Sequence, residues 1–220
     1  LNRHPNLDQR LQEKVEKITV QRQSASNLIQ QILDYSRQAV MQRHAVNLDT
    51  FLTQEITLIS QILPENIDLK YEPHEVPYLA YIDPTRIQQV LMNLIVNARD
   101  AMPDGGQIDV QLSRIEVTKT SKPFDMLTPG SWISLAVQDT GTGIPTELIP
   151  RIFEPFVTTK SVGKGTGLGL SQIFGIVKQH DGYIDVQTEL NKGTTFTVYL
   201  PEYVTDDAVS LIAVVDTEKD

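Results

Sequence analysis

Glycine alternates with other residues in the middle of segment 161–171, SVGKGTGLGLS, and this spacing could serve phosphate binding. Glycine loses more backbone freedom on folding than any other residue, so such a run needs a reason. The segment leads into GLSQIFGIVKQH, and we predict a helix over 167–180. Unpaired N–H groups and the positive dipole end at a helix start form an anion site. Lys160 and Lys164 lie just upstream, where they could meet phosphate oxygens.

The two familiar phosphate-binding loops do not account for this segment. The dinucleotide fingerprint needs GxGxxG directly after a buried strand, whereas the preceding residues here are EPFVTTK. The P-loop needs GxxxxGK[ST], but Lys164 is followed by Gly165 and position 158 is Thr. A slack linker is the other alternative, but a linker would not end in an apolar-patterned helix.

A row of polar side chains lies along one face of a helix that we predict over 84–102. Gln89, Asn93, Asn97 and Asp100 are four, four and three residues apart, so they stack on that face. Asn and Asp have poorer helix propensity than the Lys and Glu of an ordinary solvated face, which is the alternative interpretation. The Asn side-chain oxygen is a hard, neutral ligand that suits Mg²⁺.

A carboxylate stands at the end of a predicted strand in VQDTGTGIP, residues 137–145. Asp139 could accept a hydrogen bond from an exocyclic amine. Gly141 and Gly143 would let a flat ring lie against the backbone of the turn. A tight turn with an incidental Asp is an equally good interpretation of this motif alone.

Residues 7–42 are predicted to form one long helix that precedes the elements carrying these motifs. Its mostly apolar positions advance by alternating steps of four and three, which is typical of a heptad seam. They are Leu11, Val15, Ile18, Arg22, Ala25, Ile29, Ile32, Ser36 and Ala39. Such a seam needs a partner helix, although a core helix of a single globule would also bury it.

The remaining elements alternate helices with strands and predict an α+β fold with helices against a largely antiparallel sheet. Helices are expected over 48–63, capped by Asn47 or Asp49, and over 84–102, capped by Asp83. Strands are expected in NIDLKYE and YLAYID and over 108–117 and 132–138. TELIPRIF reads as a short helix, and GYIDVQTELNKGTTFTVYLP as a terminal hairpin.

Composition narrows the class of protein. With 220 residues and 40% hydrophobic content, the chain can bury one sizeable core plus an appendage. No pattern typical of a secretory signal opens the sequence given, and it contains no apolar run of about 18 residues. The absence of cysteine suits a reducing cytosol. The net charge of −9 disfavours a nucleic-acid binder. We therefore expect a cytoplasmic chain that contacts neither nucleic acid nor membrane.

Taken in order, these motifs resemble the ATP-binding domain of histidine protein kinases, within the gyrase–chaperone–mismatch-repair ATP-binding superfamily. NLIVNARDAM resembles the N box, DTGTGIP the G1 box, IFEPF the F box and GTGLGLS the G2 box. GTTF resembles the last adenine-side motif, and the match runs over 89–201. NARDAM, EPFVTTK and GIVKQHDG are most similar to the nitrogen-regulation type and related hybrid kinases.

The resemblance implies a Bergerat-type α/β sandwich with ATP and Mg²⁺ as cofactors. Asn97 would coordinate the metal, Asp139 would bind the adenine amino group, and Thr194 would support adenine through water. Phosphates would lie under a mobile lid over 156–166. The ATP-binding set that it implies is Asn93, Asn97, Asp100, Asp139, Gly141, Gly143, Ile144, Phe156, Thr159, Lys160, Lys164, Gly165, Thr166, Gly167, Leu168, Gly169 and Thr194.

The resemblance also divides the chain into three parts. Residues 1–45 would be the second helix of a dimerisation bundle, 46–204 the ATP-binding kinase domain, and 205–220 an acidic linker. In that linker SLIAVVDTEKD resembles the first strand of a receiver domain, with Thr217 where a second Asp is usual.

None of the chain's histidines has the context of a phosphoacceptor. His4 and His44 lack the neighbouring residues that the family uses, and His74 and His180 are predicted to be surface residues. We therefore expect the acceptor helix upstream of Leu1. The implied partners are that helix, a response-regulator receiver domain and, in the intact kinase, a second copy.

Asn93 decides between the activities of the superfamily. Its ATP hydrolases carry a glutamate at this position as general base, and an amide cannot take a proton. Phosphoryl transfer is therefore favoured over hydrolysis. An ATPase of the chaperone or gyrase class, and a nucleotide-gated module without transfer activity, remain the alternatives.

Overall fold

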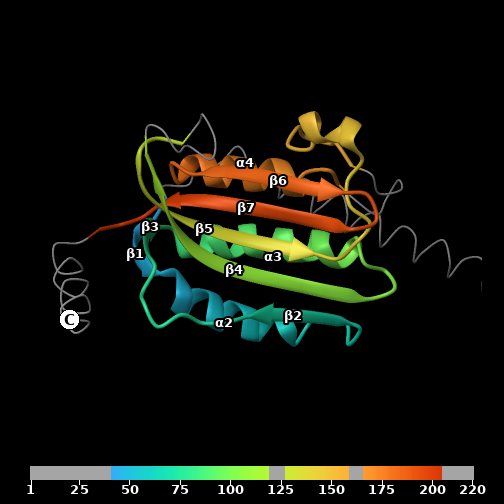
Figure 1. The fold of residues 1–220 in the computed structure, drawn as a ribbon, viewed down its shortest axis with the longest axis horizontal. Coiled ribbons are helices and arrows are strands. Elements are labelled where there is room, and N and C mark those ends of the chain that lie inside the picture. The colour runs from blue at the N-terminus through green and yellow to red at the C-terminus, as the bar shows by residue number, and fades with distance from the viewer. Residues whose placement is uncertain (1–40, 119–126, 159–165, 205–220) are drawn as a thin grey trace, which may run out of the picture.

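The computed structural model describes residues 41–118, 127–158 and 166–204 (Figure 1). Its elements are β1 His44–Asn47, α2 Leu48–Ser60, β2 Ile67–Tyr71, β3 Leu79–Ile82, α3 Pro84–Asp100, β4 Gly106–Val117, β5 Gly130–Asp139, the 3₁₀ helix η1 Thr146–Arg151, α4 Gly169–Gln179, β6 Tyr183–Glu189 and β7 Gly193–Pro201. The predicted seam helix, except for the non-helical Met41 and Gln42, and the receiver-like segment lie outside the described residues.

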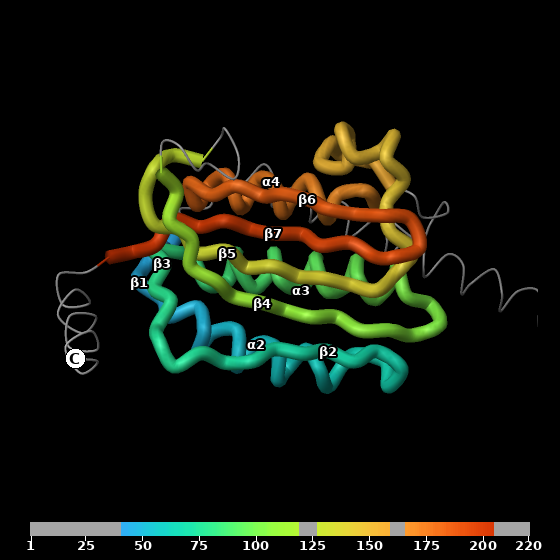
Figure 2. The backbone as a smooth tube through the Cα atoms, in the orientation of Figure 1, coloured from blue at the N-terminus to red at the C-terminus, as the bar shows by residue number. Residues whose placement is uncertain are grey.

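The strands form a five-stranded sheet in the order β2-β4-β5-β7-β6. β2 runs parallel to β4, and the other neighbours are antiparallel. α2, α3 and α4 lie against one face of this sheet (Figure 1). The α+β prediction and the two-layer sandwich are thereby confirmed. The small β1–β3 sheet lies at one end of the sandwich and η1 at the other (Figure 2).

The alternation of β5 places a carboxylate among core residues. Successive side chains of a strand point to opposite faces, so every second residue faces the helices. Ile133, Leu135 and Val137 fill the core, and Asp139 falls on the same face at the strand end. Its residue exposure is 5%. The strand that supplies the core therefore also delivers a buried acidic group.

α3 begins where the sequence predicts. The Asp83 carboxylate accepts hydrogen bonds from the N–H groups of Thr85 at 3.1 Å and Arg86 at 3.3 Å, and proline follows at the first helical position. Residues such as Leu91 and Ile95 bury the apolar face in the core. The adjoining face carries the asparagines away from that core.

Several element boundaries differ from the predictions. The strand β1 was not expected, because four residues next to a helix cap give no clear alternating pattern. α2 ends at Ser60 and not at Leu63. α4 begins at Gly169 because Gly167 has φ of +65°, outside the right-handed helical region.

His180 is the clearest correction to the sequence interpretation. It was predicted to lie on the surface, but it is 2% exposed. Its Nε2 accepts a hydrogen bond from the Asp83 N–H at 3.0 Å, and its Nδ1–H donates to the Ile176 carbonyl at 2.8 Å. Sequence pattern marks a histidine after a helix as polar and cannot show that another element supplies partners for both nitrogens.

The buried imidazole predicts a pH dependence of stability. Burial lowers the pKa of His180 below its usual 6.5, so the unfolded chain binds a proton that the folded chain resists. The contribution of His180 to the free energy of unfolding is therefore fully present above pH 6.5, the usual pKa of histidine. It is lost as the pH falls towards the lower pKa of the folded state. His180→Gln keeps an acceptor for the Asp83 N–H but does not titrate. We expect its free energy of unfolding, from urea titrations at about pH 7.5 and 5.5, to fall less than that of the wild type. Equal losses would contradict this origin.

Candidate functional site

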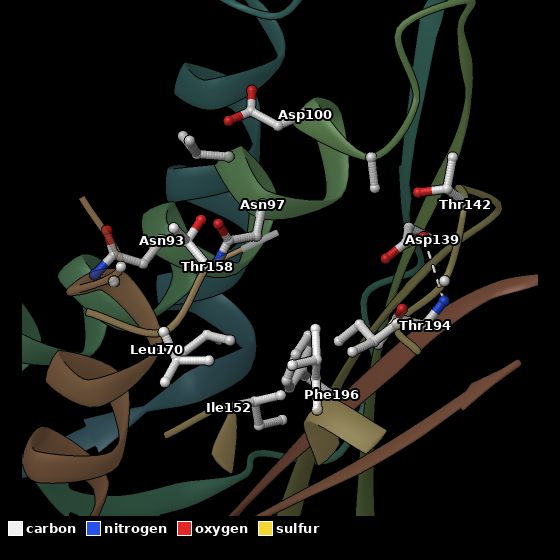
Figure 3. Close-up of a pocket in the computed structure, with 18 of the residues that line it drawn as sticks. Asn93, Asn97, Asp100, Asp139, Thr142, Ile152, Thr158, Leu170, Thr194 and Phe196 are labelled. Carbon is white, nitrogen blue, oxygen red and sulfur yellow. Dashed lines mark hydrogen bonds between the residues drawn. The ribbon is translucent and has the colours of Figure 1, made fainter. Parts of the chain in front are cut away.

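A cavity of about 400 Å³ opens between α3, α4, η1 and the ends of β5 and β7 (Figure 3). Its walls are partly polar and partly apolar. The lining residues are Asn93, Val96, Asn97, Asp100, Ala101, Asp139, Thr142, Gly143, Ile144, Leu148, Ile152, Val157, Thr158, Thr166, Gly167, Gly169, Leu170, Thr194 and Phe196. Figure 3 shows Asn93 and Asn97 on one side, facing Asp139 and Thr194 on the other.

The cavity brings together most of the described residues in the predicted set. Asn93, Asn97, Asp100, Asp139, Gly143, Ile144, Thr166, Gly167, Gly169 and Thr194 line it. Gly141, Phe156 and Leu168 do not belong to the lining, and the Phe156 residue is 64% exposed. Thr159, Lys160, Lys164 and Gly165 lie outside the described residues, as does most of the predicted lid.

The Asp139 carboxylate is held by one oxygen. Its Oδ1 accepts from the N–H groups of Gly141 at 2.8 Å and Thr194 at 3.2 Å. Among the described residues no donor reaches Oδ2, which leaves it available to a ligand in the cavity. Burial raises the pKa of Asp139 above its usual value, against the lowering effect of the two amide donors. The site thus retains an acceptor that is costly to bury.

Two threonines extend this polar wall. The Thr188 hydroxyl donates to the Gly193 carbonyl at 3.1 Å and accepts from the Ile144 N–H at 2.9 Å. Its single hydrogen is therefore committed, so Thr194 Oγ1–H donates across the 3.0 Å that separates the two hydroxyls. Acceptor lone pairs of Thr194 remain beside Asp139. Thr188 was not predicted, although it lies opposite Thr194 in the expected hairpin.

The glycines of the DTGTGIP turn have packing roles of their own. A Cβ on Gly141 would lie 2.7 Å from the Ala101 Cβ, and one on Gly143 would lie 2.3 Å from the Glu189 carbonyl oxygen. Both glycines are therefore explained by close contacts within the protein. The prediction that they admit a flat ring is not needed to account for them.

Gly169 is different, because its missing side chain faces the cavity. A Cβ there would have only the Asn97 Nδ2 within 4 Å, at 3.9 Å. The side chain of Leu168 makes no capping hydrogen bond at the start of α4. An anion could therefore reach the first amides of α4 directly, which is the arrangement that favours phosphate.

Asn93 and Asn97 extend the polar surface opposite that helix start. Asn93 Nδ2 is buried and has no hydrogen-bond partner among the described residues, which is unusual enough to point to a missing acceptor. The described residues contain no cluster of three acidic or histidine side chains that could hold a metal alone. The Asn97 oxygen fits a Mg²⁺ that takes its other ligands from phosphate and water.

Backbone contacts join Phe156 to Gly167, just before α4. The Phe156 N–H donates to the Gly167 carbonyl at 2.9 Å, and a Cβ on Gly167 would lie 2.5 Å from the Phe156 carbonyl carbon. The two ends of the predicted lid are thereby joined by backbone contacts. Phe156 contributes its backbone to this junction, and its ring does not reach the cavity.

The apolar wall of the cavity is what sequence reasoning missed. Leu148, Ile152, Leu170 and Phe196 form much of it. Phe196 could have been found, because it lies two residues beyond Thr194 on the same face of β7. Leu148 lies on η1, Ile152 directly follows η1, and Leu170 lies in the first turn of α4. The orientation of these segments depends on tertiary packing.

Comparison with known proteins identifies the family of this site. Residues 82–204, which contain α3, β5, α4 and β7, match the model of the histidine kinase-, DNA gyrase B- and HSP90-like ATPases. The chain belongs to this family. Membership in this ATPase family implies that the chain binds ATP. The described residues include no helix long and apolar enough to cross a membrane.

Two of the similar proteins are sensor kinases. The chain is 38% identical over 196 residues to the sensor kinase CckA of Brucella abortus, which covers 89% of this chain and 21% of that protein. It is 32% identical over 181 residues to the sensor histidine kinase ZraS of Escherichia coli K12, covering 82% and 36%. The chain thus spans about a fifth to a third of these relatives.

A solved structure supports the same assignment. The catalytic domain of histidine kinase ThkA superposes with a TM-score of 0.56 at 32% identity, covering 74% of this chain and 97% of that domain. By these matches the chain contains an ATP-binding domain of the type found in the catalytic part of histidine kinases.

The half-satisfied carboxylate predicts opposite effects on stability and binding. Because the folded-state pKa of Asp139 is raised, the charged carboxylate destabilises the folded protein at neutral pH. The free energy of unfolding therefore gains from this residue as the pH falls through that pKa and the carboxylate takes up a proton. Asp139→Asn keeps an acceptor for the Gly141 and Thr194 amides but removes the charge. We expect an unchanged or higher free energy of unfolding at neutral pH.

The same variant should bind an ATP analogue at least tenfold more weakly, because a hydrogen bond to a charged group contributes about 1.5–3 kcal/mol. Calorimetry and urea titration measure the two quantities. Wild-type affinity in the variant would remove Asp139 from the site.

Gly169 and Gly175 give a matched pair of substitutions in α4. A Cβ at Gly175 would meet nothing within 4 Å, and one at Gly169 would meet only Asn97 Nδ2, at 3.9 Å. Replacing a helical glycine by alanine contributes roughly 0.5–1 kcal/mol of stability. Both alanine variants should therefore fold at least as stably as the wild type, but only Gly169→Ala should weaken binding of an ATP analogue. Equal affinities for all three proteins would show that phosphate does not approach Gly169.

Proposed function

We propose that this chain binds Mg²⁺ and ATP between α3 and α4 and delivers the γ-phosphoryl group to a histidine on a helix outside the described residues. The observation that supports this most directly is that a hydrogen-bond acceptor and an anion-binding helix start line opposite sides of one cavity. An open carboxylate acceptor lies at the end of β5, and an uncapped helix start lies opposite Asn97.

Each group has a role that follows from its chemistry. Asp139 Oδ2 accepts from the adenine amine, Thr194 offers lone pairs to an adenine-bound water, and Ile152 and Phe196 contact the ring. The first amides of α4 bind the phosphates, with Lys160 and Lys164 as additional cations. Asn97 would hold the Mg²⁺, which would supply positive charge to neutralise the phosphates.

The lining of the cavity disfavours hydrolysis. Its carboxylates are those of Asp100 and Asp139. Asp100 pairs with the Arg99 guanidinium at 2.7 Å, and Asp139 is assigned to adenine. Asn93 is an amide and cannot accept a proton from water. Transfer to an imidazole, which brings its own nucleophilic nitrogen, is favoured over attack by water.

The acceptor is proposed to lie elsewhere in the intact protein. His44, His74 and His180 do not line the cavity, and His180 is bonded through both nitrogens. We propose a homodimer in which the acceptor helix precedes residue 1, a response-regulator receiver domain as the next acceptor, and a cytoplasmic location. The similarity to sensor kinases supports the kinase part of this proposal.

Labelling with γ-³²P-ATP and Mg²⁺ tests this function. We expect the full-length protein to gain an acid-labile, base-stable phosphoryl group, and its Asp139→Asn variant to gain little. The 220-residue chain should bind ATP, remain unlabelled and hydrolyse it slowly.

Other outcomes identify the alternatives. Label on one of the chain's own histidines would overturn the proposed acceptor. Rapid phosphate release would favour an ATPase, and binding without any label in the full-length protein would favour a nucleotide-gated module.

A further inference from the structure

A polar cluster closes the end of the α3–α4 pair that lies away from the cavity. It consists of Gln42, Arg43, Asp83, His180 and Asp181, and we call it the clamp. Asp83 caps α3, while His180 and Asp181 directly follow α4. Gln42 and Arg43 directly precede β1. Three segments that are distant in sequence therefore meet at one place.

Asp83 is the centre of the clamp. Its N–H donates to His180 Nε2 at 3.0 Å, which links the start of α3 to the end of α4. Its Oδ2 accepts from the Gln42 N–H at 3.1 Å, while Oδ1 caps the helix. Arg43 adds an ion pair to Asp181 at 2.7 Å. The chain that enters the domain is thus bonded to the ends of both helices.

The geometry connects the clamp to the cavity. α3 and α4 run antiparallel, since Asp83 meets His180 at one end and Asn97 faces Gly169 at the other. Asp83 and Asn97 are separated by about four helical turns, roughly 20 Å. A small change in the angle between two packed helices at the clamp therefore changes the separation of Asn97 from the start of α4.

We propose that His180 and Asp83 are positioning residues for the nucleotide site, and that Gln42 and Arg43 couple its affinity to the position of the preceding chain. The inference rests on the proposed ATP site. Differential affinity is what lets one site bias another, and the coupling must be reciprocal. Displacing the entering chain would loosen the helix pair and weaken ATP binding, and nucleotide would tighten the clamp.

The ion pair between Arg43 and Asp181 gives the first test because one partner is open to solvent. The side chain of Asp181 is 73% exposed and that of Arg43 is 26% exposed. Pairs with an exposed partner contribute about 1 kcal/mol, so losing this one should leave the fold intact. We expect Arg43→Gln and Asp181→Asn each to weaken binding of Mg²⁺-ADP about two- to fivefold. Their double variant should be no weaker than either single variant, since both remove the same contact.

Lys70→Gln is the matched control. It also removes one positive charge and an ion pair, here between the exposed side chains of Lys70 and Asp68 on β2. It should bind like the wild type. If Arg43→Gln and Lys70→Gln both bind with wild-type affinity, the proposed coupling to the entering chain is wrong, whereas failure of the wild type to bind would instead reject the ATP site.

The buried member of the clamp gives the second test. His180→Leu removes the acceptor for the Asp83 N–H and should weaken binding about tenfold or more. His180→Gln supplies an amide oxygen and should restore most of the affinity. A folded His180→Leu protein with wild-type affinity would overturn the positioning role.

Hydrogen exchange measures the reciprocal effect in the unmodified chain. Saturating Mg²⁺-ADP should slow exchange at the amides of Gln42 and Asp83 severalfold, although neither lines the cavity. Amides of β2 should show no matching change. Equal protection in both places, or none at the clamp, would contradict the coupling.

Discussion

The burial of the Asp139 carboxylate at the end of β5 is the constraint on which the site depends. The alternation that turns Ile133, Leu135 and Val137 into the core also turns this charge inward. Backbone N–H groups from the next turn and from β7 satisfy one oxygen. A Cβ on Gly193 would lie 1.9 Å from the Asp139 carbonyl oxygen, so only glycine lets β7 begin there. The pairing of β5 with β7 therefore satisfies Oδ1 of Asp139 and leaves Oδ2 for a ligand.

The helix pair α3 and α4 supplies the opposite side of the cavity. α3 buries one face in the core and presents Asn93 and Asn97 on the adjoining face, while α4 starts beside them without a side-chain cap. A buried donor without a partner and an uncapped helix start both cost stability in the free protein. Such groups are retained where a ligand supplies the missing partners. The phosphate oxygens of a nucleotide are hydrogen-bond acceptors that could serve both the Asn93 amide and the first N–H groups of α4.

The sequence predicts those parts of the site that depend on local spacing, such as the asparagine face, the Asp83 cap and the strand that delivers Asp139. It fails where tertiary contacts decide. His180 is polar in pattern but buried, because Asp83 and Ile176 supply its partners. Gly141 and Gly143 are explained by packing on Ala101 and Glu189, which no local pattern reveals. The apolar wall from η1 depends on how that segment folds back over the cavity.

Nucleotide preference tests the central claim most directly, namely that Asp139 Oδ2 accepts from the amine of adenine. Inosine triphosphate differs from ATP at this position by a carbonyl in place of the amine. Calorimetry should show that the wild-type chain prefers ATP by about tenfold or more and that Asp139→Asn, whose amide can donate, loses or reverses this preference. The same preference in both proteins would place adenine elsewhere and contradict the account.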